Sequence, residues 1–166
     1  MIELIFCYYD FELTVPKEWV VAFDRKSNYN AGIVYFTTPT NGRLDHVWDK
    51  LDKYTKKHPN IDAFMKSYFD VLRNNRNIKE LNMTEGQKTT DDNHELFPHE
   101  ISYTLKTPLS KALKQKLIGN TLYCKKTNRF VAVYTSLNTN KENPDEASLR
   151  EAIKSFICNC NLPPKP

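Results

Sequence analysis

Apolar and polar residues alternate over much of the chain, and this period of two is typical of β-strands. In FELTV, for example, Phe11, Leu13 and Val15 fall on one side of an extended segment, and Pro16 ends it. Short polar or proline-bearing breaks such as RKSNYN and TPTNG separate the alternating stretches. The stretches predicted as strands are FELTV, WVVAFD, AGIVYFTT, IKELNM, HEISYTLK, NTLYC and RFVAVYTSL, the last two joined by a KKTN hairpin turn.

Three other stretches follow a helical period, with apolar residues at offsets of three, four and seven. The last of them, NPDEASLREAIKSFI, carries Asn143 as a predicted N-cap and Pro144 at the first helical position. Asn60 is a predicted N-cap for the middle one. The apolar stripes of the three predicted helices are Leu44–Val47–Trp48–Leu51–Tyr54, Ile61–Phe64–Met65–Tyr68–Leu72 and Leu149–Ile153–Phe156–Ile157.

This order of elements predicts an α+β fold with a single antiparallel sheet and helices packed against it, an αβα-type sandwich. The length of 166 residues fits one domain over 1–166, with a proline-rich tail over 160–166. Nine Tyr, nine Phe and two Trp supply the bulky apolar surface for its core.

Two stretches of the sequence carry a family resemblance. FELTVPKEW contains Val15-Pro16 followed by Trp19, and SLREAIKSF lies in the last predicted helix. With the break after IVYFTT, this order resembles the PsbP-like fold of the photosystem II extrinsic subunit, a yeast nuclear-import factor and bacterial DcrB-like proteins. The resemblance implies a non-enzymatic accessory or binding module, and it transfers no site residue to this chain.

Charge is distributed unevenly. The segment from Ile101 to Lys141 has eight basic residues and no Asp or Glu, whereas the whole chain has a net charge of only +4. Such a segment either spreads its lysines over a solvated surface or forms a face that binds nucleic acid or another polyanion. The candidate anion-binding residues are Lys111, Lys114, Lys116, Lys125, Lys126 and Arg129.

Cysteines are the main candidates for chemistry. Cys158 and Cys160 are two residues apart, so they face opposite sides of a helix but the same side of an extended segment. We expect SFICNC to be the end of a packed helix, with Cys160 as its last buried residue. If the helix instead ends near Ile157, both thiols can turn toward Cys124, and the cluster becomes a candidate zinc site or disulfide.

A fourth zinc ligand would have to be a histidine. His99 shares its strand face with Ile101 and Tyr103, so we expect either a core histidine or the ligand that joins Cys124, Cys158 and Cys160. His94 lies in the acidic stretch TTDDNHE, which lacks the spacing of a calcium loop and is predicted to be a solvated loop.

No sequence motif indicates an enzyme: only four glycines are present, and no phosphate loop, nucleophile elbow or metalloprotease helix occurs. We therefore expect a small binding or accessory protein with a protein partner. The alternatives are a metal-binding or redox protein and a binder of nucleic acid or acidic surfaces. The first residues lack a basic start and carry Glu3 and Asp10, so they predict a strand and not a signal peptide. Cytoplasmic localisation follows as an expectation, with no predicted membrane span; the sequence does not indicate the oligomeric state.

Overall fold

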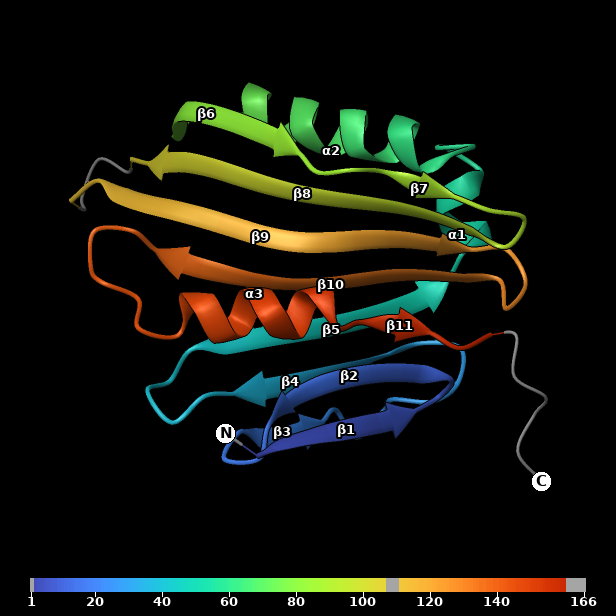
Figure 1. Cartoon of the computed structure of the whole chain (residues 1–166). Helices are drawn as coiled ribbons and strands as arrows, with labels where there is room; N and C mark the ends of the chain where they lie inside the picture. Colours follow the sequence, from blue (N-terminus) through green and yellow to red (C-terminus); the bar gives the residue numbers. More distant parts are fainter. Residues whose placement is uncertain (1, 107–110, 161–166) are drawn as a thin grey trace.

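Two antiparallel sheets pack face to face in the computed structural model, which describes residues 2–106 and 111–160 (Figure 1). The small sheet has the strand order β1-β2-β11, and the large sheet has the order β3-β4-β5-β10-β9-β8-β6, with β7 paired to β8. The predicted single sheet is therefore wrong, although the α+β class and the antiparallel pairing are confirmed. The strands are β1 (Glu3–Tyr8), β2 (Phe11–Pro16), β3 (Val20–Phe23), β4 (Gly32–Thr37), β5 (Arg43–Lys50), β6 (Ile78–Glu85), β7 (Thr89–Thr90), β8 (His94–Leu105), β9 (Leu113–Cys124), β10 (Arg129–Asn138) and β11 (Ile157–Cys158).

The main core lies between the two sheets. Alternation in β2 places Phe11, Leu13 and Val15 against the large sheet, and all three are essentially fully buried. Val34 and Phe36 of β4 come from the facing side by the same period of two. The second sheet exists because the β1–β2 hairpin has one apolar face, which is buried only by folding over the large sheet.

The segment 43–50 is the strand β5 and not the helix that its apolar offsets predicted. It alternates strictly, with Leu44, His46 and Trp48 buried on the side of the main core. Val47 lies on the opposite side, where it lines a cavity under another helix. Both sides of β5 thus contact apolar surroundings. Because Val47 is apolar as well as Leu44 and Trp48, the apolar residues of this strand have the offsets of three and four that are typical of a helix.

The helices cover opposite faces of the large sheet. α2 (Ile61–Asn74) begins as predicted, since the Asn60 side chain accepts a hydrogen bond from the Ala63 N–H at 2.9 Å. Its buried residues, with Leu51 and Phe130, form a second core cluster. α3 (Glu146–Lys154) packs on the other face, beside the small sheet (Figure 1). The short α1 (Asp52–Thr55) follows β5, and no helix in the described ranges is long and apolar enough to cross a membrane.

His46 is a buried polar residue at the centre of the main core. Its ring packs against Phe11, Trp48 and Phe156, and its Nδ1 lies 2.5 Å from the hydroxyl of Tyr8. Its Nε2 has no hydrogen-bond partner among the described residues. Burial, with a contribution from the positive charge of Arg129, lowers the pKa of His46 to about 3, so the ring is neutral at neutral pH.

The chain leaves α3 at Ser155 and becomes extended. The Ser155 hydroxyl lies 2.7 Å from the carbonyl oxygen of Ala152, and its oxygen accepts the Thr14 N–H at 2.9 Å. β11 then pairs with β2, and the Asn159 N–H donates to the Asp10 carbonyl at 2.7 Å. The expectation that SFICNC ends a packed helix is therefore wrong. The prolines of the predicted tail, after Cys160, lie outside the described residues.

Candidate metal centre

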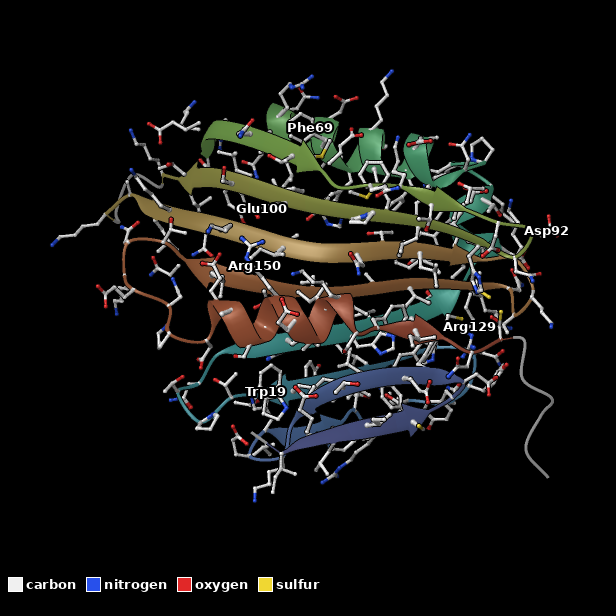
Figure 2. All side chains as sticks on the ribbon, viewed as in Figure 1. Trp19, Phe69, Asp92, Glu100, Arg129 and Arg150 are labelled. Carbon is white, nitrogen blue, oxygen red and sulfur yellow. The ribbon has the colours of Figure 1, made fainter. Side chains whose placement is uncertain are left out.

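Four potential metal ligands meet at one end of the large sheet. They are His94, Cys124, Cys158 and Cys160, and their donor atoms all lie within 4.8 Å of one another. Figure 2 labels Asp92 and Arg129 at this same end of the molecule. Three of the four are the cysteines of the predicted site. The histidine is His94 and not His99, which the sequence had offered.

Strand pairing brings the first two ligands together. His94 begins β8 and Cys124 ends β9, and the two residues are directly opposite in the antiparallel register. Residues paired in this way project their side chains from the same face of a sheet, about 5 Å apart. The face is that of the main core, to which Cys124 belongs.

The extended C-terminal segment supplies the other two. Cys158 lies on β11 and Cys160 two residues beyond it, so in extended backbone both side chains point the same way. Because α3 ends at Lys154, neither thiol is turned away by helical geometry. Cys160 is buried and Cys158 is half-buried, as expected for a segment that closes over the end of the sheet.

His99 lies away from the cluster, so of its two expected roles it is a buried histidine and not the fourth ligand. It is five residues from His94 on the same strand, and an odd spacing puts it on the opposite face. Its ring lies under α2, with Nδ1 3.2 Å from the Phe97 carbonyl oxygen. His94, predicted to be part of a solvated loop, occupies the ligand position instead.

Neighbouring groups hold His94 in the orientation that a metal ligand requires. Its Nε2 lies 3.1 Å from the sulfur of Cys160, and its Nδ1 lies 3.3 Å from Oδ2 of Asp91. The other oxygen of Asp91 accepts the backbone N–H groups of Asn93 and His94, both at 2.7 Å, and these bonds lower the pKa of Asp91. A carboxylate on the outer nitrogen of a ligating imidazole is a common arrangement at zinc sites.

Three sulfurs and one imidazole nitrogen form a donor set that suits Zn²⁺ in tetrahedral geometry. Zn–S bonds of about 2.3 Å place the donors of a tetrahedron about 3.8 Å apart. The observed limit of 4.8 Å is thus within a small inward movement of that geometry.

Hydrogen bonding between the thiols shifts their pKa values. A hydrogen bond from Cys158 lowers the pKa of Cys124, and the same bond raises the pKa of Cys158. Burial raises the pKa of Cys160. A divalent cation binds all three sulfurs as thiolates, so its binding displaces the protons of these thiols.

Arg129 is a buried cation beside the cluster. Its Nε–H donates to the hydroxyl oxygen of Thr127 at 3.0 Å, and that hydroxyl donates to the sulfur of Cys124 at 3.0 Å. The guanidinium also donates to the Tyr9 carbonyl at 2.5 Å and lies over the ring of Phe11, 4.1 Å from its centre. Three thiolates, one neutral imidazole and Zn²⁺ carry a net charge of −1, which Arg129 would balance.

The contacts of Arg129 predict that its contribution to the free energy of unfolding depends on zinc: unfavourable or neutral without the metal and favourable with it. Its Nη2 has no hydrogen-bond partner among the described residues and lies 3.9 Å from Oδ2 of Asp10. A buried charge this weakly paired costs stability on its own. We therefore expect Arg129→Met to be neutral or stabilising without zinc, but to weaken zinc binding about 10- to 100-fold through lost charge compensation.

Chemical denaturation with and without zinc, together with competition against a chromophoric chelator, measures both effects. Arg25→Met, which removes an exposed arginine on another loop, is the control. Equal destabilisation of Arg129→Met in both metal states would contradict a role for Arg129 in balancing the site.

The basic residues of the acid-free segment do not gather into one face. Lys111, Lys114 and Lys116 lie at one end of β9 and Lys125 and Lys126 at the other, and 11 residues of strand span about 36 Å. Lys116 is paired with Glu146, and Lys125 with Glu95. Arg129 is 1% exposed and faces the core. The predicted coherent positive surface is thus not formed by these residues.

Comparison with known proteins supports the fold and no particular activity. No protein-family model matches the sequence. No curated protein matches it either. The structure is similar to the solution structure of cyanobacterial PsbP (CyanoP) from Synechocystis sp. PCC 6803, with a TM-score of 0.53 and 11% sequence identity over 94% of this chain and 92% of that one. The PsbP-like fold expected from the sequence is thereby confirmed.

Proposed function

We propose that this protein is a non-enzymatic binding or accessory module that holds one Zn²⁺ in a Cys₃His site formed by His94, Cys124, Cys158 and Cys160. The observation that carries the proposal is the convergence of four donors of the right chemistry within 4.8 Å, drawn from β8, β9 and the C-terminal segment. Clusters of acidic residues are common on protein surfaces, whereas three sulfurs and an oriented imidazole are not a usual surface feature.

The completeness of the donor set supports a structural role for the metal. Catalytic zinc sites keep one coordination position for water or substrate, whereas four protein ligands close the site. A closed site stabilises the segments that it joins, because binding energy is available only in the folded arrangement. Here the joined segments are the large sheet and the chain end that pairs with β2.

Metal content tests the proposal directly. Protein produced with zinc in the medium and then desalted should contain about one zinc per chain by elemental analysis. His94→Gln should remove the metal, and His99→Gln, five residues along the same strand, should not. Cys158→Ser should likewise lose zinc, with Cys7→Ser on β1 as the matched control. Retention of zinc in His94→Gln, or its absence from the wild-type protein, would contradict the proposal.

Asp91 provides a finer test because it is not itself a ligand: Oδ2 lies beside the outer nitrogen of His94, and Oδ1 accepts two backbone N–H groups, which an asparagine oxygen can also accept. We expect Asp91→Asn to weaken zinc binding about 10- to 100-fold, the usual effect of removing such a carboxylate. Asp92→Asn is the matched control, since Asp92 is the adjacent exposed carboxylate (Figure 2). Equal affinities for Asp91→Asn and Asp92→Asn would show that Asp91 does not support the ligand.

A further inference from the structure

A second site lies on the other face of the large sheet, under α2. A cavity of about 290 Å³ lies between the helix and strands β5, β8, β9 and β10, and His99 is among the residues that line it. Phe64, Met65 and Tyr68 line it from the helix, and Phe130 and Ala132 line it from β10. Small-molecule pockets in proteins begin at about this volume, and they are mostly apolar with a few placed polar groups.

The side chains that line this cavity favour an uncharged occupant. Among the described residues no Asp, Glu, Lys or Arg side chain lines the cavity, so nothing there would compensate an ion taken out of water. The aromatic rings from both walls offer faces and edges to a flat apolar molecule. The occupant that this lining suits is therefore neutral and aromatic.

His99 supplies one directional polar contact. Its Nδ1 lies 3.2 Å from the Phe97 carbonyl oxygen, and because a carbonyl only accepts, Nδ1 must carry the proton. In the neutral ring Nε2 is then an acceptor, and no group of the described residues hydrogen bonds to it. Burial lowers the pKa of His99, which keeps the ring neutral. An acceptor in an apolar cavity favours a ligand that donates a hydrogen bond.

We propose that this cavity binds a small, uncharged aromatic molecule bearing one hydroxyl or N–H donor, which His99 Nε2 accepts. The site is independent of the metal centre, because His99 and His94 project from opposite faces of β8. A protein that failed to bind zinc could still bind this molecule. Failure to bind the molecule would likewise leave the zinc proposal unaffected.

The probe is 2-naphthol, a fluorescent two-ring molecule with a single donor, compared with 2-methoxynaphthalene, which lacks the donor. We expect saturable binding of 2-naphthol and at least about tenfold weaker binding of the methoxy compound, a difference of ~1.4 kcal/mol. His99→Leu should remove that preference, and His99→Gln, which keeps an acceptor, should retain part of it.

Filling the cavity gives the second arm of the test. Ala132→Leu should abolish 2-naphthol binding, whereas Ala22→Leu adds the same side chain on exposed β3 and should not. Chemical-shift changes in the wild-type protein, which need no variant to fold, should centre on Met65 and Ala132. The proposal fails if 2-naphthol does not bind up to its solubility limit or binds no better than 2-methoxynaphthalene. Shift changes centred elsewhere would also overturn it.

Discussion

Replacing Cys158 and Cys160 together with serine should lower the free energy of unfolding by about 4 kcal/mol when zinc is present about a thousandfold above its dissociation constant. Two of the four ligands are lost, and the C-terminal segment keeps its short pairing with β2, the packing of Phe156 and the contacts of Ser155 and Asn159. In excess chelator the wild-type protein loses the same contribution. The difference between the two proteins should then shrink to about 1 kcal/mol or less.

Denaturant unfolding in zinc and in chelator measures this difference, and Cys7→Ser serves as the control because that cysteine lies on exposed β1. Hydrogen exchange adds a local measure, since the amides of β11 should lose protection in the variant before those of β9 and β10. A double variant equally destabilised with zinc and with chelator would show that the two cysteines act by packing alone.

Acid should destabilise the wild-type protein more steeply than His46→Phe. The pKa of His46 is about 3 in the folded protein and about 6.5 when unfolded, so below pH 6.5 the unfolded chain binds a proton that the folded one excludes. The contribution of neutral His46 to the free energy of unfolding is therefore fully present above pH 6.5. It falls by about 1.4 kcal/mol per pH unit toward pH 3. Between pH 6.5 and pH 4 the variant should lose about 3 kcal/mol less than the wild-type protein.

The difference between the two proteins isolates His46, since proton competition for the thiolates affects both equally. His46→Gln is a second variant that does not titrate and keeps a partner for the Tyr8 hydroxyl, whose bond to His46 Nδ1 is 2.5 Å. Parallel pH dependences for all three proteins would contradict a neutral buried His46. An NMR titration that gives His46 an ordinary pKa would do the same.

Local patterns predicted most of the elements, because alternation and capping are local. Phe11, Leu13 and Val15 alternate, and Asn60 caps α2, without reference to the rest of the chain. Segment 43–50 was mistaken for a helix because His46 counted as polar, although the folded protein buries it beside Trp48. The second sheet depends on the packing of the β1–β2 hairpin over the large sheet and on the pairing of β2 with β11, and no local pattern encodes either contact.

The candidate site was predicted in part for the same reason. The spacing of Cys158 and Cys160 is local, and it showed that both could address one atom if the helix ended early. His94 joins them only through the register of β8 against β9, where it is opposite Cys124. That register could have been derived from the sequence by pairing the two strands outward from their connecting loop, and the hairpin would then have favoured His94 over His99.

The small sheet unites the two ends of the described chain: β2, itself paired with β1, is joined to a strand that lies some 147 positions later. During synthesis the apolar face of the β1–β2 hairpin is made well before the segment that completes its sheet. Contacts this distant in sequence form late in folding, and exposed strand edges can pair with other chains in the meantime. A nascent chain that stalls before Cys158 would therefore present an open β2 edge to chaperones or to other copies of itself.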